Sequence, residues 1–576
     1  MNSLDSLPGT LPRAVIPDNL DLAASVSAVL TNFPALTAAQ FTPDAIWRDS
    51  FALTGTFRTI AGVEKILTAW NATSSAHSPR DFVLIPPSLH VARHDEYAWI
   101  DARFQFTTHG ALCSGGLSLV PAADGSLKIW VLTTILENLT GAGSGNVDVL
   151  AAGVPAPISS SPDTFDVVVV GGGQSGLAVG GRLHALGISY VVIDKYLEVG
   201  DSWKTRYDST KLHTLRDYSH LPFEKTFDAS YPQWLTKDDL ARGFKAWTDK
   251  FNINVWTRSP LKSCTWNDNL WTLNIERHGE PRSLTAKHVV FAIGTCQIPY
   301  MPDYADKHLF NGTILHSAEY KSPAAWKGKK GVVIGTANTG HDVAVDMVNA
   351  GLESVTMVQR SQTWVLPQEN YARLNEPLYN AHMPTELADR LFFSLPLGVT
   401  RQLLLYFLNI LTDTQRERFD ALEARGFKLQ RYGDLIYALY ERFGGHYMDV
   451  GSSELIIQGR ITMQPCLPTA FTPDGLLLQD GSILPADLVV FATGFHGNLR
   501  TAVGTFVGQD IHAQLSDFLG VDDEGELRGA WKFTGHPKLW YSGYDLGSAR
   551  YFSRFIALQI KADLLGRPLD RYEIRL

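Results

Sequence analysis

The sequence predicts an α/β protein in which one parallel-sheet domain is inserted into another, behind a smaller α+β domain. A length of 576 residues suggests three domains or four. Two strand–turn–helix units, at residues 165–186 and 331–350, each begin with β-branched residues and continue into a glycine turn and a helical pattern. Ahead of them, alternating apolar residues at 97–106 and 127–133 predict strands of a curved antiparallel sheet packed by helices.

Changes in composition predict the domain boundaries. Three prolines in residues 1–20 predict an extended arm, and Gly, Ser and Pro at residues 141–162 predict a linker after the α+β domain at 21–140. The first glycines of the two turns lie 164 residues apart, too far for a solenoid repeat but suitable for an inserted domain. The first parallel-sheet domain is therefore expected at residues 163–320 and 446–576, and the second at 321–445, with a helical insertion at about 370–445.

Composition and charge exclude several classes of protein. Hydrophobic residues make up 45% and charged residues 19%, which excludes a disordered chain. The net charge of −9, without any Lys/Arg-rich run, argues against a nucleic-acid binder. The four cysteines form no CxxC pair, which argues against a dithiol redox site, a structural zinc finger or another metal site: Cys113, Cys264, Cys296 and Cys466.

No segment has the pattern of a membrane span or a signal peptide. The longest apolar stretch, residues 391–411, is interrupted by Pro396 and Arg401. The N-terminus has no charged head followed by an apolar run. We therefore expect a cytoplasmic protein with no integral membrane association.

The first glycine turn fits the pattern G-x-G-x-x-G. Gly171 permits the tight turn, Gly173 lets the backbone approach a pyrophosphate, and Gly176 lets helix and strand pack closely. The next strand ends in Asp194, 18 residues past Gly176, where a carboxylate can accept hydrogen bonds from ribose hydroxyls. A turn that merely tightens the strand–helix connection is the alternative. The motif favours a Rossmann-type dinucleotide site, whose candidate contacts are Gly171, Gly173, Gln174, Ser175, Gly176, Asp194 and Lys195.

The second glycine turn, at residues 335–340, has Ala337 in place of the middle glycine, which adds one methyl group. The strand that follows ends in Arg360 and Ser361 instead of an acid. A guanidinium and a hydroxyl suit a 2′-phosphate, which a carboxylate would repel, so NADP is predicted over NAD. A solvated charge at the strand end is the alternative for Arg360. The candidate contacts are Gly335, Asn338, Thr339, Gly340, Arg360 and Ser361.

Three further segments carry a resemblance to a known family. Residues 310–321 resemble the F-x-G-x-x-x-H-x-x-x-(Y/F/W) fingerprint of class B flavin-dependent monooxygenases, just before the second turn as in that family. Gly-Asp-Ser-Trp at 200–203 resembles its G-[GD]-x-W element, and residues 487–495 resemble its late ATG strand. The resemblance covers roughly residues 163–566. Within the family, residues 314–322 are most similar to the YUCCA-type indole-3-pyruvate monooxygenases and their fungal and bacterial relatives.

The resemblance implies FAD in the outer domain and NADPH in the inserted one. In the family, reduced flavin forms a C4a-hydroperoxide that gives one oxygen atom of O2 to a substrate, and the other atom leaves as water. The further flavin contacts that the resemblance implies are Asp201, Trp203, Leu212, His213, Thr493, Gly494 and Gly543. The implied catalytic residues are His316, His213 and Tyr320, although His316 alternatively orients the domain junction.

The reaction stays open among several alternatives. The expected partners are O2 and a small organic substrate, through N or S oxygenation or oxidative decarboxylation of an α-keto acid. Baeyer–Villiger enzymes usually close the fingerprint with Trp, and this chain has Tyr320, which argues modestly against conversion of a ketone to an ester. A flavin-binding interaction protein is the non-enzymatic alternative. The helical insertion offers a surface for a homo-oligomer.

The N-terminal domain lies outside this resemblance. Residues 45–62, followed by a helical pattern, resemble an NTF2/SnoaL-like α+β barrel. Trp47, Asp49 and His109 are candidates to line a cavity, but core and turn residues of a packing module are the favoured interpretation.

Overall fold

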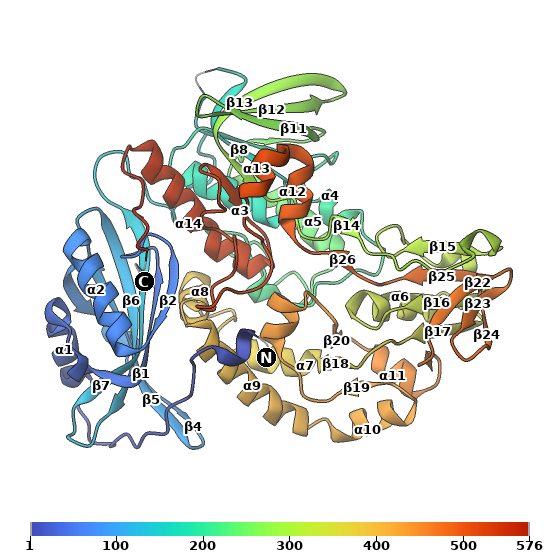
Figure 1. The fold of residues 1–576 in the computed structure, drawn as a ribbon, viewed down its shortest axis with the longest axis horizontal. Coiled ribbons are helices and arrows are strands. Elements are labelled where there is room, and N and C mark those ends of the chain that lie inside the picture. The colour runs from blue at the N-terminus through green and yellow to red at the C-terminus, as the bar shows by residue number, and fades with distance from the viewer. Residues whose placement is uncertain (1–2, 160, 574–576) are drawn as a thin grey trace.

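The computed structural model describes residues 3–159 and 161–573 (Figure 1). Residues 1–2 of the predicted arm, residue 160 of the predicted linker and residues 574–576 of the predicted first domain lie outside the described residues. After a 3₁₀ turn at Ser3–Ser6, the arm has no helix or strand up to residue 20 and runs along the N-terminal sheet, where Ala98 N–H donates to Pro12 O.

The N-terminal domain is a seven-stranded sheet with two helices. The strand order is β2-β1-β7-β6-β5-β3, with β4 also paired to β5. The strands predicted at 97–106 and 127–133 both pair antiparallel with β6, but the sheet also contains one parallel pair, β1 with β7. Alternation of apolar residues reveals which face a residue occupies but not strand direction. The elements are α1 (Leu22–Thr31), β1 (Phe41–Ser50), β2 (Phe57–Ala61), α2 (Val63–His77), β3 (Arg80–Leu84), β4 (His90–His94), β5 (Tyr97–Thr107), β6 (Ala111–Pro121) and β7 (Leu127–Leu139).

Aromatic side chains fill the space between this sheet and its helices. Phe33 meets the rings of Trp70 and Phe104 edge to face, and Trp70 meets Trp47 in the same way. The buried Asp49 carboxylate accepts hydrogen bonds from the hydroxyls of Thr54 and Thr134. Trp47 and Asp49 are therefore core residues, as the packing interpretation expects.

The first parallel-sheet domain has the strand order β10-β9-β8-β13-β12-β11, with β27 beside β13. The valines of β8 are buried, as expected of a strand covered on both faces. Helices α3 and α14 pack on each other against this sheet. The elements are β8 (Thr164–Val170), α3 (Gln174–Ala185), β9 (Tyr190–Ile193), α4 (Asp201–Lys204), α5 (Lys237–Lys250), β10 (Val255–Trp256), β11 (Leu261–Asn267), β12 (Leu270–Arg277), β13 (Glu280–Phe291), α12 (Leu499–Val507), α13 (Gln509–Gln514), β27 (Leu539–Tyr541) and α14 (Leu546–Leu564).

The second parallel sheet has the order β15-β25-β16-β17-β21. Strands β15 and β25 belong to this sheet, although the boundaries predicted at 320 and 446 assign both segments to the first domain. Those boundaries were placed by motif positions, and motifs do not reveal which strands pair. The elements are β15 (Thr313–His316), β16 (Lys330–Ile334), α6 (Asn338–Asn349), β17 (Ser354–Val358), α11 (Ser452–Ile457), β21 (Thr462–Gln464), β22 (Pro468–Thr472), β23 (Gly475–Leu478), β24 (Ile483–Pro485) and β25 (Leu488–Phe491), and the short pair β14 (Ile298–Pro299) with β26 (Phe495–His496) leads back toward the first sheet.

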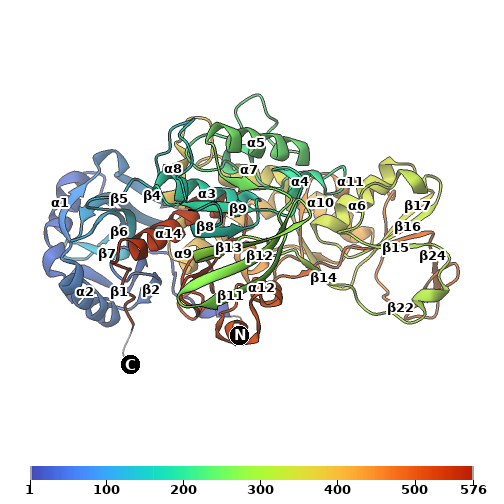
Figure 2. The same ribbon diagram turned by 90° about the horizontal axis from the view of Figure 1, so that it is seen from above.

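The segment predicted as a helical insertion forms four helices between the other domains (Figure 2). Helix α8 packs against α14 and faces the N-terminal sheet. No single helix among the described residues is long and apolar enough to cross a membrane. Helices α8 and α9 are long and apolar enough only when taken together, and the pair is bent by 101°. The elements are β18 (Thr363–Pro367), α7 (Gln368–Asn375), α8 (Thr385–Phe393), α9 (Leu397–Asp413), α10 (Arg416–Ala424), β19 (Leu429–Gln430), a π-helical turn at Tyr437–Glu441 and β20 (His446–Asp449).

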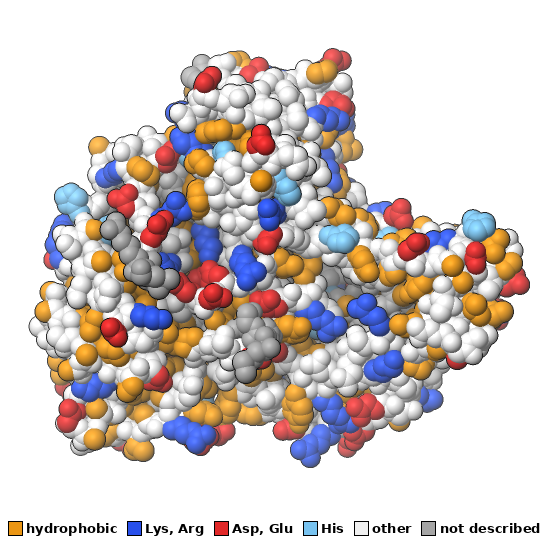
Figure 3. Space-filling view, viewed as in Figure 1, with side chains coloured by type: hydrophobic (Ala, Val, Ile, Leu, Met, Phe, Trp, Pro, Cys, Tyr) orange, Lys and Arg blue, Asp and Glu red, His pale blue; other side chains and the backbone are white. Residues whose placement is uncertain are grey.

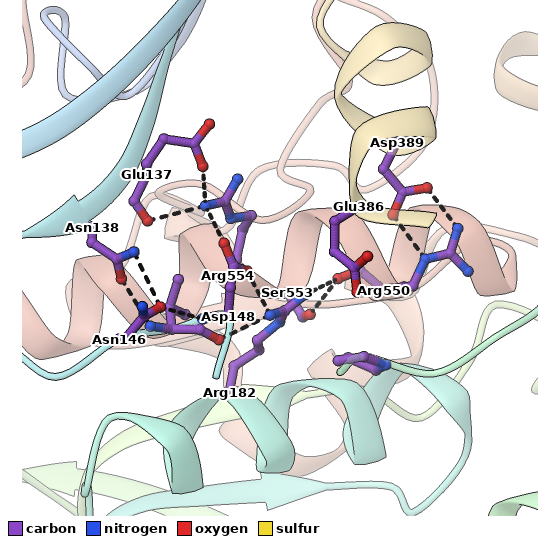
Figure 4. A network of polar contacts seen from close by, with 12 residues as sticks. Glu137, Asn138, Asn146, Asp148, Arg182, Glu386, Asp389, Arg550, Ser553 and Arg554 are labelled. Carbon is purple, nitrogen blue, oxygen red and sulfur yellow. Dashed lines mark hydrogen bonds and ion pairs between the residues drawn. The ribbon is translucent and has the colours of Figure 1, made fainter. Parts of the chain in front are cut away.

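A buried ion network joins the N-terminal domain, the linker and the first parallel-sheet domain (Figure 4). Glu137 of β7 accepts hydrogen bonds from Arg390 of α8 and Arg554 of α14, at 2.6 and 2.5 Å. Asp148 of the linker contacts both arginines and also Arg182 of α3. The arginines hold the pKa of Glu137 well below its usual range, against the opposing effect of burial. The predicted linker is therefore fixed to the folded domains.

Candidate cofactor and active site

Two of the three motif glycines in the first turn are required by the fold itself, and the third is not. Gly171 has φ +109°, and a Cβ there would lie 2.4 Å from Ala292 O. A Cβ on Gly176 would lie 1.7 Å from Gly171 O, so helix α3 could not pack on its strand. Gly173 differs, because its φ is −79° and the nearest atom to an added Cβ is Ser202 Oγ, at 3.7 Å. The open side of Gly173 is thus a cradle that a methyl group would partly fill.

The second turn repeats this geometry. Gly335 has φ +118°, and a Cβ on Gly340 would lie 2.2 Å from Gly335 O. Ala337 occupies the position of Gly173 and has nearly the same backbone, with φ −90° and ψ −177° against −79° and −170°. The replacement of the middle glycine by alanine therefore leaves the turn intact. Two helix N-termini, of α3 and α6, are presented by matching turns.

The predicted ribose acid lies beside the first turn. Asp194 follows β9, and its carboxylate accepts hydrogen bonds from the backbone N–H groups of Gly172 and Tyr196. Burial raises the pKa of Asp194 above its ordinary value, while these two bonds lower it. Lys195 is exposed and donates to Gln297 Oε1 at 3.4 Å. The Asp201 carboxylate closes its own turn by accepting from Glu198 N–H.

Gln174 joins three parts of the first domain. Its side chain accepts a hydrogen bond from Trp203 Nε1 at 3.3 Å and donates to Tyr544 O at 3.5 Å. The guanidinium of Arg206 lies 4.3 Å from the ring centre of Trp203. The turn, the Gly-Asp-Ser-Trp segment and the chain before α14 therefore meet at the N-terminus of α3, where Ser175 is buried.

His213 lies beside α6, the helix of the second turn, and Leu212 precedes it in the chain. His213 Nε2 is 3.8 Å from Asp342 Oδ2 of α6, and within the described part of the chain this nitrogen has no hydrogen-bond partner. Burial lowers the pKa of His213 to about 4 and raises that of Asp342 to about 6. The imidazole is therefore neutral at neutral pH and its Nε2 atom is available to a ligand. Leu212 is partly buried and bonds through its N–H to Leu235 O.

The candidate residues of the second turn differ in whether their side chains are free to contact a ligand. Asn338 Oδ1 accepts from Met448 N–H at 2.7 Å, so this side chain anchors β20. Thr339 lies half-buried in the first turn of α6. Arg360 and Ser361 are exposed beyond the end of β17, and no ion pair of Arg360 is found within the described residues. A free guanidinium at this edge suits a 2′-phosphate.

His316 is held by the backbone on both sides. Its Nε2 atom donates to Gly494 O at 3.1 Å, and its Nδ1 atom accepts from Ala318 N–H at 3.1 Å. Burial lowers the pKa of His316 below its ordinary value, so the ring is neutral. Thr493 Oγ1 donates to Tyr300 O next to this junction. With both nitrogens occupied, these bonds favour the orienting role for His316 over proton transfer.

Tyr320 and Gly543 pack in the protein interior. The Tyr320 ring is 1% exposed in the core of the second domain, and its hydroxyl donates to Asp346 Oδ2 at 3.5 Å. This contact directs the predicted catalytic hydroxyl toward α6. A Cβ on Gly543 would lie 2.6 Å from the Phe518 ring, so packing already requires glycine there.

Five residues near the domain junction were not predicted from the sequence. His446 of β20 is buried with its Nδ1 atom unpartnered, and burial lowers its pKa to about 4, with His213 nearby as a smaller cause. The Tyr207 hydroxyl donates to Asp342 at 2.7 Å, and Ser209 donates to Asp346 at 2.8 Å. Asp342 and Asp346 recur at i and i+4 of α6, which was the available signal, but their partners come from a loop of the other domain.

Comparisons with known proteins agree with this geometry. The family model described as pyridine nucleotide-disulphide oxidoreductase matches residues 168–387. The four cysteines are nevertheless free thiols, so the matched fold carries no dithiol here. The match covers the first glycine turn, the fingerprint and the second turn.

The relatives and the solved structure that this chain resembles are monooxygenases. The chain is 28% identical over 344 residues to the probable indole-3-pyruvate monooxygenase YUCCA3 of Arabidopsis thaliana, covering 58% of this chain and 73% of the relative. It is 27% identical to the indole-3-pyruvate monooxygenase YUCCA8 of Oryza sativa, covering 69% and 90%. The solved cyclohexanone monooxygenase of Rhodococcus sp. Phi1 shares the fold, with a TM-score of 0.52 and 18% identity over 70% of this chain and 85% of that chain. The chain is thus similar to monooxygenases, and its motifs resemble those of the flavin-dependent class.

Proposed function

We propose that the protein is an NADPH-dependent FAD monooxygenase, with FAD at the first glycine turn and NADPH at the second. The observation that carries this proposal is the pair of matching turns: the first has an open side at Gly173, and the second has nearly the same backbone at Ala337. Beside helix α6 lie two imidazoles, half-buried His213 and buried His446, each with a ring nitrogen that has no hydrogen-bond partner among the described residues. Orphaned polar atoms in a buried junction support a site for a ligand.

The residues present fit both cofactors. The α3 N-terminus would bind the FAD pyrophosphate at Gly173, and Asp194 would accept from the ribose once its bond to Gly172 N–H is exchanged. The α6 N-terminus would bind the NADPH pyrophosphate, and Arg360 would hold the 2′-phosphate. When bound, flavin reduced by NADPH supplies the activation of O2.

The protein residues supply orientation and a dry environment. Neutral His213 presents Nε2 as a hydrogen-bonding group in a junction where burial has removed its charge. His316 fixes the ATG segment through Gly494 O and thereby the relative orientation of the two sheets. The hydrogen bonds of Tyr207 and Ser209 to α6 close the junction on one side and exclude water there.

We propose oxidative decarboxylation of an α-keto acid, or oxygenation of a nucleophilic N or S compound, as the reaction. The likeness to indole-3-pyruvate monooxygenases supports the first substrate class. The ketone-oxidising neighbours share only the fold, so conversion of a ketone to an ester is the second candidate. In the decarboxylation, one oxygen atom of O2 enters the carboxylic acid product, CO2 leaves, and NADPH provides the two electrons that make water from the other atom.

The experiment is a substrate panel with three simultaneous measurements: NADPH consumed, hydrogen peroxide released and product formed. An α-keto acid, an amine, a thioether and a cyclic ketone represent the classes. The proposal expects one member to lower peroxide release and to yield one product per NADPH. Full release of peroxide with every member would favour a flavin-binding protein without oxygenase activity.

A further inference from the structure

A pocket separates the N-terminal sheet from helix α8, on the face of the sheet opposite the aromatic core. Its volume is about 770 Å³, within the range of sites for small organic molecules. Residues of β3, β5, β6 and α8 line it, and a smaller cavity of about 100 Å³ shares Ser88, Arg103 and Arg390 with it. None of the residues lining either cavity belongs to the two glycine turns.

Arg103 of β5 faces this pocket without a partner for its charge. Its Nη1 atom is buried and lacks a hydrogen bond, and no ion pair of Arg103 is found within residues 3–159 and 161–573. A guanidinium stays charged in proteins, so burying it unpaired is costly. Gly116, directly opposite on β6, contributes no side chain that could pair with it.

The neighbouring charges do not compensate Arg103. Arg390 is itself a cation, and it bonds to Glu137 through two nitrogens, at 2.9 and 2.6 Å. Glu137 also accepts from Ser114 and Arg554. Burial and then Arg390 lower the pKa of Arg103, while Glu137 opposes this. Arg103 and Arg390 thus line the pocket together with Glu137, none of whose hydrogen bonds goes to Arg103.

The outer end of the pocket is apolar. Val83, Leu112 and Leu387 line it and are 51%, 47% and 38% exposed, from three different elements. Large apolar side chains gathered at one opening, above a buried cation, form an amphipathic cavity. Asp81 and Glu386 also line the pocket, and their charges disfavour a ligand with two negative charges.

We propose that this pocket binds a small organic monocarboxylate, with its carboxylate on Arg103 and its apolar chain along Val83, Leu112 and Leu387. The guanidinium matches a carboxylate in charge and bidentate geometry. The pocket is thus a second ligand site, formed only where the N-terminal domain meets the helical insertion. The N-terminal domain thereby has a binding role even though its own interior is packed with side chains.

Calorimetric titration of the full-length protein with octanoate, and separately with octanamide, tests this site. Octanamide has the same chain and no charge, so the pair isolates the contribution of Arg103. We expect octanoate to bind at least tenfold more tightly than octanamide, and Arg103→Gln to remove that difference. Leu387→Ser should weaken both probes and keep the preference for octanoate.

Flavin content and thermal midpoint report whether each variant is folded, and neither residue contacts the glycine turns. Absence of octanoate binding to the wild-type protein would overturn the proposal. Equal affinity for the two probes would overturn it too, as would an unchanged octanoate affinity in a folded Arg103→Gln variant.

Discussion

A methyl group at Gly173 should separate cofactor binding from folding. The added Cβ meets nothing closer than Ser202 Oγ at 3.7 Å, and the backbone there is one that Ala337 already adopts. The apoprotein should therefore be unharmed, or stabilised by about 0.4–1 kcal/mol, because alanine restricts the unfolded chain. Flavin should bind about tenfold more weakly, or about 1.4 kcal/mol, since the methyl group occupies the closest approach to the pyrophosphate.

Gly176→Ala is the matched control. Its Cβ would lie 1.7 Å from Gly171 O, more than 1 Å inside the distance of about 3 Å that real Cβ atoms keep, so helix α3 must move away from its strand. Such overpacking should destabilise even the apoprotein by about 3 kcal/mol. Thermal unfolding of the apoproteins and flavin titration measure the two effects. Wild-type flavin affinity in Gly173→Ala, or apoprotein destabilisation equal to that of Gly176→Ala, would refute the reasoning.

Three further changes test other parts of the structure. Arg360→Ala should raise the KM for NADPH about tenfold to a hundredfold, as expected for loss of hydrogen bonds to a charged group, and should leave NADH kinetics unchanged. An unaltered NADPH-over-NADH preference contradicts this prediction. Burial raises the pKa of Asp342 to about 6, so the stabilisation from its protonated form is fully present below about pH 4 and is lost as pH rises through 6. Asp342→Asn should therefore reduce the difference in thermal midpoint between about pH 5 and pH 7.5, and an undiminished difference contradicts this prediction. Asp389→Asn should destabilise by about 3–5 kcal/mol, because the buried Arg550 guanidinium loses the carboxylate charge and one of its two acceptors, now at 2.7 and 2.6 Å. Thermal unfolding should show most of this loss recovered in the double variant Asp389→Leu/Arg550→Met, and a double variant no more stable than the single one contradicts it.

Local patterns predicted the parts of the molecule that depend on local physics. The continuous valines of residues 167–170 identified a strand buried on both faces, and the spacing of Gly171, Gly173 and Gly176 identified the turn after it. The substitution at Ala337 was correctly judged to be compatible with a second turn. Each of these features is decided within about twenty residues of chain, so sequence spacing contains the necessary information.

Features that depend on distant pairing were not accessible in the same way. Strand β15 joins β25 across more than 170 residues, so the boundary predicted at 320 separated it from its own sheet. The fingerprint predicted that His316 and Tyr320 matter, but only tertiary contacts show that backbone groups occupy both His316 nitrogens and that Tyr320 faces Asp346. The unpartnered Arg103 gives no signal in the sequence, because an alternating strand shows a charged residue facing outward and not what covers it.

The most direct test of the account is the flavin state of the purified full-length protein. A spectrum of the protein as isolated, or after incubation with FAD, shows whether flavin is bound, and anaerobic NADPH shows whether the second turn delivers electrons to it. We expect yellow protein that is bleached by NADPH far faster than by NADH and regains its colour when O2 is admitted. Folded protein that stays colourless and takes up no FAD, or bound flavin that NADPH does not reduce, would contradict it.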